Sequence, residues 1–154
     1  MKFKIGIILI TVIFTSCEVR SKENGAKQNL LPIVGTWELI SATTTEKDST
    51  FSTFNPKHKM IKIITPTHFA FFNHDLSRGK DSTAAFTAGG GDYVLEDSIY
   101  TEHLEYFISR EWEENKFQFV VTIKNDTLTQ SGIEKVEKLG IERLITEKYK
   151  RVAK

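Results

Sequence analysis

Histidine and carboxylate side chains that share one face of a strand are the first candidates for chemistry in this chain. His103 and Glu105 are two positions apart, so both point to the same side if residues 100–107 form a strand. Such a pair could act as a general acid and base, or form part of an open metal site. A hydrogen-bonded polar pair inside a barrel or on a wet outer face explains the same spacing more simply. We therefore predict no catalytic residue and no metal site, and we keep an enzyme using His103 and Glu105 as the less favoured alternative.

The segment 100–107 presents two alternating faces, and each of them carries a carboxylate. One face holds Thr101, His103, Glu105 and Phe107, and the other holds Tyr100, Glu102, Leu104 and Tyr106. A buried carboxylate needs a partner. The first face supplies its own partner in His103, whereas the second would need Arg151 or Tyr149 from another strand. We expect the first face to point inward.

Aromatic and polar residues at strand spacing are typical of a ligand cavity, which is mostly apolar with a few polar groups. Phe69 and Phe71 share a strand face, and so do Tyr149 and Glu147. A solid core containing Phe and Tyr is the alternative, and the sequence does not decide between the two. The candidate ligand-binding residues are His68, Phe71, His74, His103, Glu105 and Tyr149.

Other kinds of chemistry lack their motifs. Gly-x-Ser-x-Gly is absent, the four histidines are not spaced as in a helical zinc motif, and residues 79–82 lack the residues that a phosphate loop needs. We expect no cofactor. The net charge is +1, and there is no basic stripe or arm, so we expect no nucleic-acid partner.

The elements that would position these residues are short strands joined by turns. Phe117, Phe119 and Val121 alternate with polar residues, as in a strand with one wet face. Pro66 marks a connection or an edge, and Asn125-Asp126 predicts a tight hairpin. The strands are expected at residues 33–41, 60–65, 67–74, 86–95, 99–108, 117–124, 127–131 and 141–152.

Two glycine-containing segments predict local features. Gly89-Gly90-Gly91 indicates a bulge or sharp bend within one long strand. Apolar residues at positions 133, 136 and 139 predict a short helix near 133–139 with Gly140 as its C-cap. Such an all-β chain should fold as an up-and-down antiparallel meander barrel or as a sandwich.

The first 31 residues are unlike the rest. Lys2 and Lys4 precede an apolar run that would rise only about 15 Å as a helix, too short for a bilayer, as in a secretion signal. Cys17, the single cysteine, directly follows Thr15 and Ser16, an order that resembles a bacterial lipobox. We expect residues 1–17 to be a lipoprotein signal ending at the lipidated Cys17, and residues 18–31 to be a flexible tether. The protein should be exported and held in the cell envelope by a lipid anchor at Cys17 that contacts the membrane.

Gly35-Thr36-Trp37 resembles the Gly-x-Trp that opens lipocalin-like domains, and further similar segments are residues 63–70, 89–93, 100–106 and 147–151. On these segments, residues 32–152 are similar to a lipocalin-like family of uncharacterised bacterial lipoproteins. The resemblance implies a β-barrel of about eight to ten strands with a central cavity. It also implies structural roles for Trp37 and for Arg151, which would stack on it by a cation–π contact.

These observations lead to three functional hypotheses. The favoured one is an envelope-anchored, lipocalin-like lipoprotein that binds a small apolar or amphipathic molecule in the barrel. The second is a non-enzymatic interaction protein with a solid barrel, and the third is the enzyme described above. A ligand binder requires an internal void of about 300 Å³ or more.

Overall fold

Nine antiparallel strands follow one another in the computed structural model, which describes residues 32–82 and 84–153. They are β1 (Gly35–Glu46), β2 (Ser49–Ser52), β3 (His58–Ile64), β4 (His68–Asp75), β5 (Phe86–Glu96), β6 (Ile99–Phe107), β7 (Asn115–Lys124), β8 (Thr127–Val136) and β9 (Ile141–Arg151). The described residues contain no α-helix. Two 3-10 turns, η1 (Arg110–Trp112) and η2 (Glu137–Leu139), connect strands. None of these helical turns has the length and apolarity that a membrane span requires.

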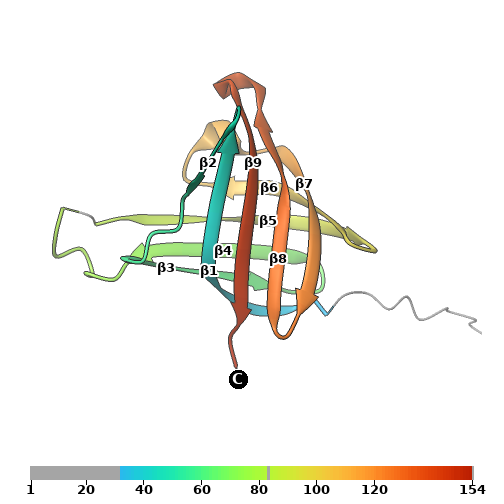
Figure 1. The fold of residues 1–154 in the computed structure, drawn as a ribbon, viewed down its shortest axis with the longest axis horizontal. Coiled ribbons are helices and arrows are strands. Elements are labelled where there is room, and N and C mark those ends of the chain that lie inside the picture. The colour runs from blue at the N-terminus through green and yellow to red at the C-terminus, as the bar shows by residue number, and fades with distance from the viewer. Residues whose placement is uncertain (1–31, 83, 154) are drawn as a thin grey trace, which may run out of the picture.

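The sheet closes on itself because β1 pairs with both β3 and β9 (Figure 1). From β3 to β9 each strand pairs with the next one in sequence, so β1 and these seven strands form a closed up-and-down barrel of eight. The short β2 is an extra strand that pairs only with the last residues of β1. The predicted all-β meander barrel is therefore confirmed.

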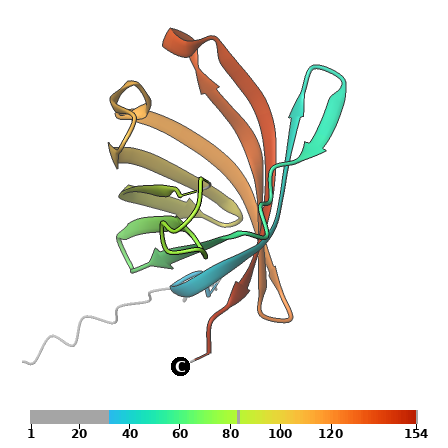
Figure 2. The same cartoon turned by 90° about the vertical axis from the view of Figure 1, so that its left-hand side faces the viewer.

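The two ends of the barrel are different. Figure 2 shows η2 and the β1–β2 hairpin projecting at one end, with the β6–β7 connection nearby, whereas β1 begins and β9 ends at the other. We call the first the loop end and the second the terminal end. The predicted secretion signal, Cys17 and the tether lie outside the described residues.

Period-two alternation determines which side chains enter the core. In β7, Phe117, Phe119 and Val121 are buried, whereas Gln118 and Val120 between them are exposed. The predicted hairpin is also present, since Asn125 and Asp126 both have positive φ, 50° and 55°, between β7 and β8. Pro66 lies in the connection between β3 and β4, as expected.

The register shift lies at the glycine segment, but the extra residue is on the partner strand rather than within the glycine strand as expected. The register between β5 and β6 shifts between Gly90 and Gly91, and Glu105 is the extra residue on β6. A Cβ on Gly91 would lie 1.9 Å from the carbonyl oxygen of His103, so only glycine permits this close strand approach. Beyond the bulge, Phe107 faces inward and packs against the core, while Tyr106 is exposed.

The predicted helix near 133–139 was wrong in type and extent. Residues 133–136 belong to β8, where they pair with β9 from Leu144 to Ile141. Only Glu137–Leu139 form one 3-10 turn, and Gly140 ends it with a φ of 63° as the expected C-cap. In β8 the backbone N–H and C=O groups of these residues form hydrogen bonds with β9, whereas in a helix they would have bonded within the segment.

Candidate functional site

The barrel interior contains a partly open cavity of about 310 Å³, here called the aromatic cavity. Its volume is at the lower end of the range for small-molecule sites, and its lining of apolar side chains with a few polar ones is typical of them. Side chains from six strands and η1 line it: Met60, Lys62, Phe71, Glu102, Leu104, Phe107, Trp112, Phe117, Phe119, Gln130, Glu134, Arg143, Ile145, Glu147 and Tyr149.

Aromatic rings form the part of this cavity nearest the loop end. The Trp112 ring, carried by η1, lies 6.1 Å from that of Phe107 and 6.0 Å from that of Phe117. Phe71 lies 5.9 Å from Phe107. Gly89 makes room for this pair, because a Cβ there would lie 2.6 Å from Phe71 and 2.9 Å from Phe107. These rings offer a rigid apolar surface to a ligand.

A buried lysine organises the polar part of the cavity. The Lys62 ammonium donates hydrogen bonds to Glu102 Oε1 at 2.7 Å and to Gln130 Oε1 at 3.0 Å. Lys62 is only 2% exposed, so its charge would be costly without these partners. The ammonium also lies 5.5–5.8 Å from the ring centroids of Phe69, Tyr100 and Tyr149.

Glu147 is a second carboxylate in this polar part. Its Oε2 accepts hydrogen bonds from the Tyr149 hydroxyl at 2.6 Å and from Gln130 Nε2 at 3.5 Å. Among the described residues, none donates a hydrogen bond to Oε1. Burial raises the pKa of Glu147, and burial also raises the pKa of Tyr149 well above its usual value. Tyr149 is therefore a neutral donor at physiological pH.

An arginine–glutamate pair joins the polar and aromatic parts. The Arg143 guanidinium donates from Nε and Nη2 to Glu134 Oε2 at 2.8 and 2.7 Å. The two residues are directly opposite each other on β9 and β8. Arg143 also lies 5.4 Å from the Trp112 ring, which ties η1 to the barrel wall.

A second cavity of about 370 Å³, here called the side cavity, adjoins the first. It lies where β1 diverges from β3, since the two strands pair only from Gly35 to Glu38. Met60 and Glu147 line both cavities, so they stand at the junction. Asn73 also lines the side cavity, and its buried Oδ1 accepts no hydrogen bond from any described residue. The remaining lining residues are Leu39, Ala42, Thr53, Phe54, Asn55 and His58.

The expected orientation of β6 was wrong. Tyr100, Glu102 and Leu104 are the buried face, whereas His103 and Glu105 lie on the outer wall. The inward carboxylate, Glu102, is neutralised by Lys62 from β3, a partner that the segment itself does not contain. His103 and Glu105 are therefore not cavity residues.

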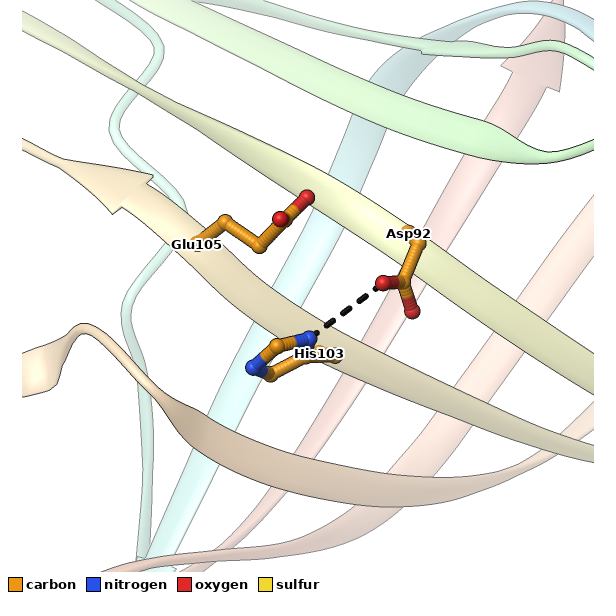
Figure 3. A group of neighbouring side chains, drawn as sticks. All are labelled: Asp92, His103 and Glu105. Carbon is orange, nitrogen blue, oxygen red and sulfur yellow. Dashed lines mark hydrogen bonds and ion pairs between the residues drawn. The ribbon is translucent and has the colours of Figure 1, made fainter.

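On the outer wall, His103 and Glu105 form a surface cluster with Asp92 of β5 (Figure 3). The His103 Nδ1 lies 3.3 Å from Asp92 Oδ2, and its Nε2 lies 3.4 Å from Glu114 Oε2. One potential ligand atom each from Asp92, His103 and Glu105 lies within 4.8 Å of the others. Imidazole with carboxylates could bind a divalent metal, but this geometry is equally that of a hydrogen-bonded surface cluster.

The other two candidate histidines are also outside the barrel. His68 is exposed, with its Nδ1 2.8 Å from the Thr67 hydroxyl oxygen, and it borders an open depression on the outer surface. His74 is exposed, with its Nδ1 2.7 Å from the Asp75 carbonyl oxygen. Of the six candidate ligand-binding residues, the structure places Phe71 and Tyr149 at the aromatic cavity.

Trp37 and Arg151 close the terminal end. Trp37 is completely buried, and its indole Nε1 donates to the Ile33 carbonyl at 2.7 Å. The Arg151 guanidinium lies 3.9 Å from the Trp37 ring centroid and donates to the Val34 carbonyl at 3.0 Å. Gly35, at a φ of 148°, leaves room for that guanidinium, because a Cβ there would lie 2.5 Å from it. These contacts are structural and lie apart from the residues that line the two cavities.

Several cavity residues were not among the candidates from sequence: Lys62, Gln130, Glu134, Arg143, Glu147 and Trp112. Lys62 carried a usable signal, because it is a lone charge in the apolar run Met60–Ile64. Gln130 shares a strand face with Leu128, which is completely buried. Trp112 follows no strand pattern, and only its position in η1 brings it to the cavity.

Closure of eight antiparallel strands around an interior with cavities defines the class of protein: an up-and-down β-barrel domain. Within that class, the chain belongs to the family described as Domain of unknown function (DUF4488), whose model matches residues 32–154. No curated protein is similar to it in sequence.

Proposed function

We propose that this protein is a lipocalin-like binding module that holds a small apolar or amphipathic molecule in the barrel. The observation that carries the proposal is the aromatic cavity of about 310 Å³, whose lining combines Trp112, Phe107 and Phe71 with Lys62 and Glu147. An apolar wall with a few fixed polar groups is the usual composition of a small-molecule site.

Two further observations favour binding over the alternatives. First, a solid barrel would leave no internal cavity, whereas this barrel contains the aromatic cavity. Second, the enzyme hypothesis requires His103 and Glu105, and both lie on the outer wall, away from that cavity. The proposal therefore contains no catalytic step and no cofactor.

In the cell, the module is anchored in the envelope as a lipoprotein through Cys17. The support is the order of charged, apolar and small residues before that cysteine. Mass spectrometry of the protein from its native membrane should find a diacylated or triacylated N-terminal Cys17. An unmodified cysteine, or a mature N-terminus beyond it, would contradict the anchor and leave the barrel's binding role to be judged separately.

The binding role is tested by titrating the purified protein with N-phenyl-1-naphthylamine, a neutral fluorophore that brightens in apolar sites. We expect saturable binding of one fluorophore per chain. Ile145→Trp adds bulk inside the aromatic cavity and should abolish binding, whereas Val120→Trp adds the same ring on the outer face and should not. Thermal melting of both variants establishes that each is folded. If Ile145→Trp unfolds the barrel, Leu104→Phe provides a smaller filling change at another lining residue. Binding that none of these cavity variants reduces would refute the proposal.

A further inference from the structure

The acidic and basic side chains around the aromatic cavity do not balance. Two bases, Lys62 and Arg143, line it together with three acids, Glu102, Glu134 and Glu147. Lys62 pairs with Glu102 at 2.7 Å, and Arg143 pairs with Glu134 at 2.7 Å. Within residues 32–82 and 84–153, no ion pair includes Glu147. Glu147 is thus a lining carboxylate with no cation of these residues within ion-pair distance.

The hydrogen bonds of Glu147 leave one of its oxygens available. Tyr149 and Gln130 both donate to Oε2, so Oε1 still has its full capacity to accept. The exposed surface of Glu147 faces cavities, because the residue lines both the aromatic cavity and the side cavity. A ligand in either cavity can therefore reach this carboxylate.

A second acceptor lies in the side cavity. Asn73 Oδ1 is buried and accepts no hydrogen bond from residues 32–82 or 84–153. A buried acceptor without a donor is destabilising, which means that a ligand or water supplying the donor is favoured there. The two open positions next to the junction are thus both acceptors, and both select for a group that donates hydrogen bonds.

We propose that the ligand is a cationic amphiphile whose ammonium group binds at the junction of the two cavities. Its N–H groups donate to Glu147 Oε1 and toward Asn73 Oδ1, and its apolar part lies against Phe71, Phe107 and Trp112. This inference rests on the proposed binding function and adds the chemical class of the ligand. An anionic amphiphile is disfavoured, because Lys62 and Arg143 are already neutralised by their own glutamates.

The electrostatics around Glu147 couple ligand binding to the protonation of its carboxyl group. Burial raises the pKa of its carboxyl group, and the charge of Lys62 offsets only part of that effect. An ammonium group at Oε1 would favour the carboxylate form. Ligand binding should therefore release protons wherever Glu147 is partly protonated in the free protein.

The experiment compares three probes with the same ten-carbon chain: decylamine, decanol and decanoate. Each displaces N-phenyl-1-naphthylamine from the purified protein, which gives its affinity. We expect decylamine to bind at least about tenfold more tightly than decanoate, with decanol between them, since one charged hydrogen-bonded contact is worth about this factor or more.

Variants identify the residue responsible. Glu147→Gln keeps the shape of the side chain and should weaken decylamine binding about tenfold while changing decanol binding less than twofold. Glu105→Gln makes the same change on the outer wall and should leave all three affinities unaltered. If Glu147→Gln does not fold, Asn73→Ala serves as the second variant, and it should weaken the binding of decylamine selectively.

The outcomes test the binding function and the cationic class of the ligand separately. Equal affinities, a preference for decanoate, or loss of all three probes in Glu147→Gln while it stays folded would overturn the cationic ligand and leave the binding module standing. If neither the fluorophore nor any of the probes binds, the binding function itself falls, and the ligand class falls with it.

Discussion

Replacing Lys62 by methionine removes the cation that holds the polar part of the cavity together. Lys62 is buried and bonded to both Glu102 and Gln130, so its loss leaves the Glu102 carboxylate in the interior without a counter-charge. Methionine has a similar length and fills much of the same volume, so the effect of cavity formation is small. The change therefore isolates the electrostatic contribution.

The expected loss of stability is about 3–5 kcal/mol, the usual cost of breaking a buried ion pair by removing one partner. A domain of this size is typically stable by about 5–15 kcal/mol, so the variant should stay folded but close to its limit. Replacing both partners, in Lys62→Met with Glu102→Leu, should recover most or all of this loss, because no unpaired charge remains.

Urea unfolding monitored by far-UV circular dichroism gives both free energies of unfolding. The single and double variants should have the m-value of the original protein and differ only in their midpoints. A Lys62→Met midpoint within experimental error of the original would show that Lys62 is solvated and that the interior network does not exist as described. A double variant less stable than the single one would contradict the reasoning about unpaired charge.

Three further predictions concern the terminal end, Glu147 and the loop after β4. Trp37→Ala should lower the free energy of unfolding by about 3–5 kcal/mol, measured by urea unfolding, because it removes a completely buried ring and its stack with Arg151. Because burial raises the pKa of folded Glu147, stability should fall as pH rises from the unfolded pKa of 4.5 through the folded one, and Glu147→Gln should remove that fall in urea midpoints taken from about pH 4 to about pH 8. Hydrogen bonds from Gly79 N–H, the Ser77 hydroxyl and Ala85 N–H hold the pKa of Asp75 well below its usual range, so its contribution to stability is full above the ordinary carboxyl pKa and is lost as pH falls toward the folded one. Asp75→Asn should accordingly unfold at a higher pH in acid titrations and raise amide exchange in residues 76–82 and 84–85.

The strands were predictable because their signals are local. Alternation in Phe117–Val121 and the Asn125-Asp126 turn each depend on a few neighbouring residues, and both are present. The glycine segment marks the register shift between β5 and β6, although the extra residue is Glu105 of β6. The short β2 was missed because Ser49–Ser52 is exposed throughout and shows no apolar alternation. The helix prediction at 133–139 failed because pairing with β9 outweighed a weak three-residue spacing.

The cavity was less predictable because its contacts join residues far apart in sequence. Lys62 and Glu102 are 40 positions apart, and Lys62 and Gln130 are 68 apart. His103 lies two positions from Glu105 in sequence and was a local partner for that carboxylate. This local pair led to the wrong prediction that their face of β6 points inward. The inward face could not be recognised without Lys62, whose position is determined by closure of the barrel.

Nuclear magnetic resonance of the two tryptophan side chains tests the central claim, ligand binding inside the barrel, most directly. The chain contains two tryptophans, so a ¹⁵N-labelled sample should give two indole N–H signals, which Trp37→Phe and Trp112→Phe assign. Trp112 lines the aromatic cavity, whereas Trp37 is buried at the terminal end with its N–H bonded to Ile33. Titration with N-phenyl-1-naphthylamine should shift the Trp112 signal in a saturable way and leave the Trp37 signal in place. An unmoved Trp112 signal at saturating fluorophore would contradict binding in the cavity.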